Sequence, residues 1–364
     1  MMLSAGNGFI MQSEKYSRDN AGQSLKKYIL LKQGELAYNH GASKAKQFGC
    51  CYELTEPEAR IPYVYHCFKI NDHEYTPFIA MALNNAKMDK QLKRLVSSSV
   101  RMDGLLNISF EDYMSVTLHL PSSTEQKHIA DFLKKIGERI AAQEKLLASL
   151  KKYKRGLLRT VFSEKGSHSL LHDAVSHRID EVCDVLSGKR IPKGETFSPR
   201  PTEYRYITVS DMGEKYVSSD TLQFITSHTE KQITRYKVRN GDIIISVAGT
   251  LGKLNIITPD LDGVNLTENC DRFTNFRGIN PEYLYHVLSS DLIQSQIEAS
   301  KTKNGQPKLA LERIRNFVVP VPHQIRQEQF VGVMNSIDKY IASQQAILDR
   351  CCKARAGLLQ QLFI

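Results

Sequence analysis

The sequence PSSTEQKHIADFLKKIGERIAAQEKLLASLKKYKRGLLRTVF, residues 121–162, recurs without a gap as PHQIRQEQFVGVMNSIDKYIASQQAILDRCCKARAGLLQQLF, residues 322–363. The copies lie 201 residues apart and share 12 of 42 positions, which indicates an internal duplication. Solenoid repeats have periods of roughly 20–50 residues, so this period excludes them. The duplication predicts a function that needs two similar devices on one chain.

Each copy has the apolar spacing of one long helix. Starting from Ile129 and from Phe330, apolar residues recur in alternating steps of four and three, the heptad spacing of a coiled coil. Neither copy contains an internal proline, and each follows a proline-bearing stretch that suits the entry to a helix. About 38 residues, rising about 1.5 Å each, predict a rod of about 57 Å.

A helix of this length needs a partner for its apolar stripe, and the other copy is the nearest candidate. Polar residues interrupt both stripes at the same places, Gln143 matching Gln344 and Lys154 matching Arg355. Matched glutamines favour mutual packing, because polar residues at a coiled-coil seam set its register. In the alternative arrangement, each helix packs only on the domain that precedes it.

Composition favours an intracellular partner of a polyanion. The 364 residues carry 49 Lys and Arg against 39 Asp and Glu, a net charge of +10 and a pI near 9.1, although many proteins share such an excess. No stretch approaches the roughly 20 apolar residues of a membrane span, and the N-terminus lacks a signal-peptide pattern. We therefore expect a cytoplasmic protein without membrane contact. Its seven cysteines contain no CxxC spacing, which argues against a zinc site or a disulfide framework.

The predicted architecture is α+β, with two non-identical domains and two long helices. The domains are expected at residues 1–121 and 173–322, and the helices at residues 122–165 and 323–364. A polar linker around 163–172 precedes the second domain.

The second domain alternates strand-like runs with turns at Asn240-Gly241 and Gly249, and one helix is expected over Pro281–Ala299. Residues 32–54 of the first domain parallel residues 239–258, and residues 97–121 parallel 300–322. These local parallels indicate that the two domains share one scaffold and differ in their surface residues. The expected strands of the second domain are Tyr206–Val209, Asp242–Val247, Leu254–Thr258, Asp271–Phe276 and Phe317–Val321.

These features together resemble the specificity subunit of type I restriction-modification systems. The resemblance covers essentially the whole chain, and it depends on the order and double occurrence of its marks. The marks are Glu125-Gln126, Gly156-Leu157-Leu158 with Phe162, Gly357-Leu358-Leu359 with Phe363, NGDIIISVAGTLGK from Asn240, VLSGKRIPKG from Val185, and LLKQGELAYNHGASK and GLLNISFED in the first domain.

The resemblance implies two target recognition domains, each of which reads one half of a split sequence in double-stranded DNA. It also implies that the two helices pack antiparallel as a spacer with internal pseudo-twofold symmetry. Each end of the pair is expected to dock a methyltransferase subunit, giving two per chain, and restriction-translocase subunits are expected to join through these.

The first domain departs from the pattern. IDEVCDVLSGKRIP, residues 179–192, opens the second domain, whereas no counterpart precedes the first. We therefore expect the first recognition domain to be shortened at its N-terminus and the second to dominate DNA binding.

Signals of catalysis are missing from the sequence. It contains no NPPY-like methyltransferase motif and no GxGxxG, and GTLGK at Gly249–Lys253 does not have the spacing of a P-loop. That segment is either a hairpin turn or a DNA-contacting loop. The histidines show no metal-ligand spacing such as HExxH. We predict a non-catalytic subunit without metal or cofactor.

DNA contacts are expected from loops rich in Lys, Ser, Thr, Asn and Gln. Arg and Lys can bind guanine O6 and N7, and Asn and Gln can bind adenine N6 and N7, while other lysines hold phosphates. In the second domain the candidates are Ser187, Lys189, Arg190, Lys193, Ser246, Thr250, Lys253, Lys301, Lys303, Asn304, Gln306 and Lys308. In the first domain they are Tyr38, Asn39, His40, Ser43, Lys44, Lys46 and Arg101.

Two other classes of function compete with this interpretation. One is a coiled-coil scaffold or decoy piece of a defence system, which would not bind DNA specifically even with a methyltransferase present. The other is an intrinsic nuclease or methyltransferase, but the sequence lacks the carboxylate cluster or cofactor loop that such chemistry needs.

Overall fold

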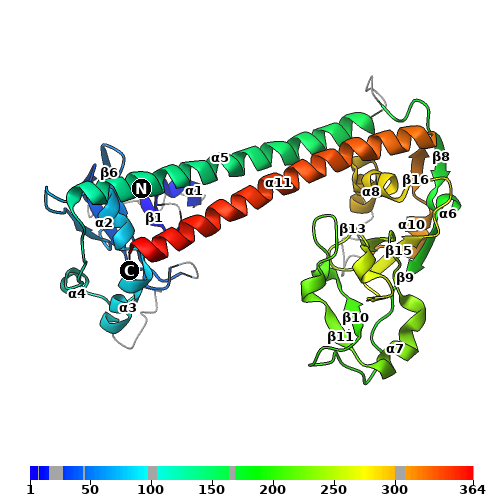
Figure 1. Ribbon diagram of the computed structural model, residues 1–364, viewed down its shortest axis with the longest axis horizontal. Helices are drawn as coiled ribbons and strands as arrows, with labels where there is room; N and C mark the ends of the chain where they lie inside the picture. The colour runs from blue at the N-terminus through cyan, green and yellow to red at the C-terminus, as the bar shows by residue number, and fades with distance from the viewer. Residues whose placement is uncertain are drawn as a thin grey trace. The chain divides into compact units, whose positions relative to one another are not determined.

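The computed structural model describes residues 1–6, 8–15, 28–43, 46–96, 105–163, 169–299 and 308–363. The chain divides into two compact units. The first unit is Met1–Leu146 with Gln344–Ile364, and the second is Leu147–Ser343. Each unit holds one α+β domain and one part of each long helix, and both chain termini belong to the first unit (Figure 1).

Both units contain short strands, short helices and a share of the long helices α5 (Ser123–Val161) and α11 (Gln324–Leu362). The other elements of the first unit are β1 (Met2–Ser4), β2 (Gly8–Ile10), α1 (Gln12–Lys15), β3 (Ile29–Lys32), β4 (Leu36–Asn39), β5 (Cys50–Glu53), β6 (Glu58–Ile61), β7 (His66–Phe68), α2 (Thr76–Ala82), α3 (Ala86–Leu95) and α4 (Phe110–Met114). Those of the second unit are β8 (Val175–Arg178), α6 (Ile179–Val182), β9 (Asp184–Ser187), β10 (Tyr204–Ile207), β11 (Gln223–Ile225), α7 (Ser227–Ile233), β12 (Ile243–Ser246), β13 (Leu254–Ile256), β14 (Asn265–Leu266), β15 (Cys270–Thr274), α8 (Pro281–Ser289), α9 (Asp291–Ala299), α10 (Leu311–Arg315) and β16 (Val318–Val321), with 3₁₀ turns at Val209–Asp211, Ser219–Thr221, Thr234–Tyr236 and Pro259–Leu261.

The second unit is built around an antiparallel sheet of order β13-β12-β15-β9. Its inner strand β12 is buried along its whole length. Ile243 and Ile245 pack on Tyr283 and Leu284 of α8 on one face, and Ile244 belongs to a separate core. The sheet β11-β10-β14 forms a second layer with its own core. The apolar run in β12 thus reflects burial on both faces.

The first unit has a smaller sheet of order β5-β4-β7, with the pairs β3-β6 and β1-β2 beside it. Its core holds Leu36 and Tyr38 of β4, Phe78 of α2 and Met88 of α3. The Tyr38 ring stacks on the ring of Tyr113, with centroids 3.8 Å apart. The order β5-β4-β7 matches the order β13-β12-β15 in the main sheet of the second unit. The two units therefore contain equivalent strands, as the sequence parallels predict.

The two long helices pack against each other and run antiparallel within each unit (Figure 1). In the first unit, Gln143 Nε2 donates to Gln344 Oε1 at 2.7 Å and to its backbone oxygen at 3.1 Å. In the second, Lys154 contacts Asp338 at 2.5 Å and Phe162 packs on Phe330. The prediction of mutual packing through the matched glutamines is confirmed. Lys154, by contrast, pairs with Asp338, while Arg355 is exposed in the first unit.

An identical glutamine ties the start of each helix to its own domain. Gln126 Oε1 accepts from Tyr75 N, and its Nε2 donates to Pro121 O. Gln327 repeats both bonds, accepting from Asn280 N and donating to Pro322 O. Tyr75 and Asn280 are the N-cap residues of α2 and α8, so these two helices occupy equivalent places.

An identical phenylalanine closes the far end of each helix. Phe162, at the end of α5, packs on Tyr283 of α8, with ring centroids 6.1 Å apart. Phe363, at the end of α11, packs on Phe78 of α2 at 5.1 Å. The duplication seen in the sequence therefore reflects a duplicated docking of helix ends on domains.

The structure corrects some expected boundaries. The single helix expected over Pro281–Ala299 is two helices, because α8 ends at Ser289 and α9 begins at Asp291. Ser290 has extended backbone angles, and its hydroxyl donates to Val287 O, which ends α8. The segment Gly249–Lys253 belongs to the turn of the β12–β13 hairpin.

Candidate nucleic-acid interface

Three candidate loops of the second unit meet at one end of its main sheet. Gly188 N–H donates to Cys270 O at 3.0 Å, which holds the loop after β9 against the start of β15. Ala248, after β12, forms a bridge pair with Lys308, and Leu309 N–H donates to Val247 O at 2.9 Å. Loops that are far apart in the sequence thus share one edge, as the prediction of a common DNA face requires.

At position 188 the backbone lies so close to the carbonyl oxygen of Thr267 that no side chain can be accommodated. A Cβ atom there would lie 2.0 Å from Thr267 O, so only glycine fits. The next residue, Lys189, donates its N–H to Leu266 O at 2.8 Å and has its ammonium 5.8 Å from the centre of the Tyr236 ring. This geometry holds the Lys189 backbone and leaves its side chain exposed.

Arg190 lies on the surface in an ion pair. Its Nε donates to Glu268 Oε1 at 2.6 Å, while 78% of its side chain is exposed. Burial alone would raise the pKa of Glu268, but the hydrogen bond from Arg190 lowers it. The carboxylate therefore stays charged and orients the guanidinium through Nε, and the two terminal nitrogens of the guanidinium carry further N–H donors.

The β12–β13 hairpin presents Thr250 to solvent, but it does not present Ser246. Ser246 is completely buried, and its hydroxyl accepts from Lys253 N–H at 2.9 Å. The Lys253 ammonium donates to Met212 O. The expectation that Ser246 contacts DNA is wrong for this conformation, because its hydroxyl holds the hairpin.

A buried carboxylate lies beneath this edge, at Asp271 of β15. It is 2% exposed and pairs across the sheet with Ser187 of β9. Burial raises its pKa to about 6, although a hydrogen bond from Ser187 and the charges of Lys308 and Arg315 lower it. Nothing in the sequence pattern singles out Asp271 or Glu268, because both act through contacts made only in the fold.

The first-unit candidates are mostly structural. Tyr38 and His40 are buried; the Tyr38 hydroxyl donates to Phe48 O, and His40 Nδ1 contacts Leu106 O. The expectation that these two contact DNA is therefore wrong for this conformation. Asn39 Oδ1 accepts from Gly41 N–H, and Ser43 Oγ accepts from Lys46 N–H at 3.0 Å.

The other candidates divide into those outside the described residues and those that are exposed. Outside the described residues lie Lys44, Arg101, Lys301, Lys303, Asn304 and Gln306. The exposed candidates that the structure does describe in the second unit are Ser187, Lys189, Arg190, Lys193, Thr250 and Lys308.

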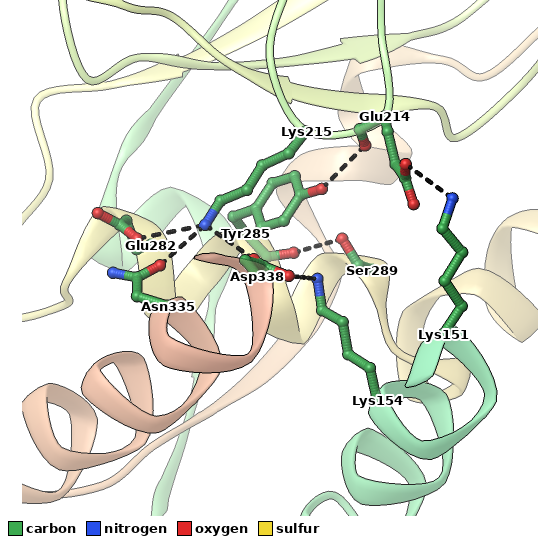
Figure 2. A network of polar contacts seen from close by, with 9 residues as sticks. All are labelled: Lys151, Lys154, Glu214, Lys215, Glu282, Tyr285, Ser289, Asn335 and Asp338. Carbon is green, nitrogen blue, oxygen red and sulfur yellow. Dashed lines mark hydrogen bonds and ion pairs between the residues drawn. The ribbon is translucent and has the colours of Figure 1, made fainter. Parts of the chain in front are cut away.

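A network of partly buried charges fastens the second domain to both long helices (Figure 2). Lys215 Nζ lies 3.2 Å from Asp338 Oδ2 and 3.5 Å from Glu282, and it donates to Asn335 Oδ1 at 2.9 Å. Lys154 of α5 approaches the other oxygen of Asp338. Burial alone would raise the pKa of Asp338, but the bonds and charges of the two lysines lower it. The domain that carries the candidate loops is thus held firmly on the helix pair.

Within the described parts of the chain, no group of His, Cys, Asp and Glu side chains is arranged to hold a metal ion. In the same residues no helix is long and apolar enough to cross a membrane.

Residues 172–350 match the family model for the type I restriction modification DNA specificity domain. The type I restriction enzyme MjaVIII specificity subunit of Methanocaldococcus jannaschii is 21% identical over 288 residues, which cover 75% of this chain and 67% of that protein. The type I restriction enzyme EcoBI specificity subunit of Escherichia coli is 29% identical over 143 residues, covering 37% of this chain and 30% of that protein.

Two solved structures share the fold over 92% of this chain. One comes from a study of complex assembly and conformational transition of the type I R-M system, with a TM-score of 0.57, 17% identity and 82% of that chain covered. The other is the type I restriction-modification S subunit from M. genitalium, with a TM-score of 0.54, 16% identity and 83% covered. Fold and matched domain together define the class of DNA specificity subunits. Residues 172–350 thus belong to the family of type I restriction modification DNA specificity domains, and the chain is similar to type I specificity subunits over most of its length.

Proposed function

We propose that this chain is the non-catalytic subunit that selects the DNA sequence for a type I restriction-modification complex. It binds a split target in double-stranded DNA, and the second unit contributes most of the binding. Two methyltransferase subunits dock on the helix pair, and restriction-translocase subunits join through them.

The main support is the shared edge of the second unit, where exposed Lys189, Arg190 and Lys308 lie on loops that backbone hydrogen bonds hold together. Phosphate contacts by such cations position a protein on DNA, and side chains that enter a groove read bases. Thr250 on the β12–β13 hairpin and Ser187 at the end of β9 supply hydroxyl groups for either role.

Arg190→Ala tests this surface. If Arg190 reads a guanine, the substitution costs about 1–3 kcal/mol on the target duplex and relaxes the preference at one position. If it binds a phosphate, target and scrambled duplexes weaken alike and the salt slope falls by about one unit. Affinities for both duplexes at several salt concentrations, with methyltransferase present, distinguish the two roles.

Arg178→Ala is the matched control for that experiment. Arg178 is also an exposed arginine in a 2.6 Å ion pair, here with Asp180, but it lies at the end of β8, directly before α6, and not on the candidate loops. Its removal is expected to leave DNA affinity unchanged. Equal behaviour of the two variants would show that the DNA surface lies elsewhere and would favour a scaffold without specific DNA binding.

The spacer role is tested by lengthening both helices together. Inserting seven residues after Gln143 and seven before Gln344 preserves the heptad register and adds about 10 Å. Since one turn of DNA spans about 35 Å and about 10.5 base pairs, the gap in the methylated motif should grow by about three base pairs. Four residues inserted after Gln143 alone break the register and should abolish methylation. An unchanged gap in the seven-residue variant refutes the spacer role.

The absence of catalysis is tested with the isolated chain. Purified alone, it should transfer no methyl group and cut no DNA, and it should copurify with two methyltransferase subunits per chain. Methyl transfer by the isolated chain would contradict the proposal.

A further inference from the structure

In the second unit, a tight turn at residues 213–216 contacts the long helices through its side chains and strand β13 through its backbone. Gly213 N–H donates to Tyr216 O at 3.0 Å, which closes the turn. A Cβ atom at position 213 would lie 2.4 Å from that oxygen, so only glycine permits this approach. The turn therefore has one closely defined backbone.

The side chain of Lys215 joins this turn to the helix pair (Figure 2). Its Nζ lies 3.2 Å from Asp338 and 2.9 Å from Asn335, both on α11, and Asp338 also pairs with Lys154 of α5. Only 11% of the Lys215 side chain is exposed. Burial alone would lower the pKa of Lys215, but the charge and the hydrogen bond of Asp338 raise it, so the ammonium stays charged.

The backbone of the same turn holds strand β13. Lys215 O accepts from Ile256 N–H at 2.9 Å, and Gly213 O accepts from Asn255 Nδ2 at 3.2 Å. One residue thus bonds the helices through its side chain and the strand through its carbonyl oxygen. A displacement of Lys215 from α11 would therefore act directly on β13.

Strand β13 belongs to the hairpin that carries a candidate for DNA contact. Lys253, directly before β13, donates through its ammonium to Met212 O and through its N–H to Ser246 Oγ at 2.9 Å. Thr250 is exposed in the turn of this hairpin, three positions before Lys253. A continuous set of bonds therefore runs from the helix pair through residues 212–216 to the exposed hairpin turn.

The first unit repeats the bond between turn and hairpin strand. Tyr52 of β5 is the counterpart of Asn255, because their strand partners Ala37 and Ile244 correspond in the parallel between residues 32–54 and 239–258. The Tyr52 hydroxyl donates to Ala5 O at 2.9 Å, just as Asn255 donates to the turn of the second unit. This bond is therefore part of the scaffold that both units share.

The ion pair between turn and helix is not repeated. The sequence between β1 and β2 is Ala-Gly-Asn, residues 5–7, and it contains no lysine. The counterpart of Asp338 in the duplicated helix is Gly137. Neither member of the Lys215–Asp338 pair thus has a charged counterpart, and the tie from turn to helices is an addition of the second unit.

We propose that Lys215 is a positioning residue for target recognition by the second unit. Anchored on Asp338 and Asn335, it fixes the turn at residues 213–216, and this turn fixes the β12–β13 hairpin in the position from which Thr250 meets DNA. Lys215 does not itself contact DNA, because its ammonium is bonded to α11. This inference rests on the proposed function, and it adds a residue remote from the DNA surface to those that decide target preference.

Lys215→Met tests the proposal, because it removes the charge and retains an unbranched apolar side chain. Asp338 keeps its bond to Lys154, so the fold should survive. With methyltransferase present, the affinity ratio of target to scrambled duplex should fall about tenfold. The affinity for scrambled duplex and the salt slope should not change, since no phosphate contact is lost.

Hydrogen exchange in the free chain tests the positioning without DNA. In Lys215→Met, the amides of β13 and of residues 249–252 should exchange about tenfold faster, because the strand loses its anchor on the helices. The amides of the β10–β11 pair should keep the rates of the parent chain. Faster exchange confined to the hairpin distinguishes positioning from a general loss of stability.

Lys151→Met is the matched control. Lys151 of α5 pairs with Glu214 of the same turn at 3.3 Å, but the two side chains are 41% and 77% exposed. An ion pair this exposed contributes little. The affinity ratio and the exchange rates should therefore stay within about twofold of the parent values.

Three results would overturn the proposal. The first is a Lys215→Met chain that keeps the target preference of the parent. The second is unchanged exchange at β13 and residues 249–252. The third is an equal loss of affinity for target and scrambled duplexes, which would assign Lys215 to stability or to a phosphate contact. A parent chain without preference for any duplex would instead refute the proposed function, and exchange at β13 would then decide whether Lys215 positions the hairpin.

Discussion

The two units share a scaffold but differ in how their domains are held on the helices. Both use the same glutamine at the helix start and the same phenylalanine at the helix end. Only the second has the network around Asp338, whose counterpart in the repeat is Gly137. The contacts that the repeated glutamine and phenylalanine make with the domains are duplicated, whereas the ion pairs of Asp338 have no counterpart at Gly137.

The largest effect is expected from Asp338→Asn. The substitution leaves Lys154 and Lys215, whose side chains are 21% and 11% exposed, without their shared carboxylate, which should cost about 4 kcal/mol of unfolding free energy. Urea denaturation measures the loss, and hydrogen exchange should localise it to the second unit. Equal loosening of both units would contradict the proposed difference between them.

The shared glutamines test the similarity. Gln126→Leu and Gln327→Leu each leave partly buried backbone groups without these partners, so each should cost about 2 kcal/mol in its own unit. Hydrogen exchange at the start of α2 and of α8 reports each effect separately. A cost in only one unit would show that the duplicated bonds are not equivalent in energy.

The next effect depends on pH and concerns His286, whose counterpart in the first unit is Met81. Burial, with the charges of Lys154 and Lys215 adding to it, lowers the pKa of His286 to about 3, and neither ring nitrogen has a hydrogen-bond partner among the described residues. In the unfolded chain His286 binds a proton as the pH falls through about 6.5, whereas in the folded chain it stays neutral until the pH nears 3. The folded state therefore loses stability as the pH falls below about 6.5.

His286→Met should remove this acid sensitivity. The gain should be about 2 kcal/mol at pH 5 relative to the change at pH 7.5, where the histidine is neutral in both states. Urea denaturation at both pH values measures it. A constant difference between the variant and the parent chain across this range would refute the assignment.

The smallest expected effect is at Gly137 itself. A Cβ atom there meets no other atom within 4 Å, so Gly137→Ala should stabilise α5 by about 0.8 kcal/mol through helix propensity alone. Thermal denaturation measures the gain. Destabilisation by Gly137→Ala would contradict the idea that only helix propensity acts at this position.

Part of the fold follows from the sequence alone. The heptad repeat predicts two long helices, and the aligned Gln143 and Gln344 predict their contact, because both signals are periodic along the chain. The turn at Gly249 also agrees with the observed hairpin. These features depend on neighbours in sequence or on the repeat itself.

The candidate site could be predicted only in part. Loops rich in lysine and small polar residues mark the edge where Lys189, Arg190 and Thr250 are exposed. The same composition gives no sign that Tyr38, His40 and Ser246 are buried. Burial depends on which strands pair and which face is covered, and short strands leave that register weakly encoded in sequence.

The sequence by itself determined the duplication, the long antiparallel helices and the class of the protein, since repeated apolar spacing and ordered motifs survive without coordinates. Tertiary structure alone decided the network around Asp338 and the burial of Tyr38. Lys215 lies 123 positions from Asp338, and the Tyr38 ring stacks on the ring of Tyr113 in α4. Both depend on long-range contacts, which the spacing of residues along one chain does not specify.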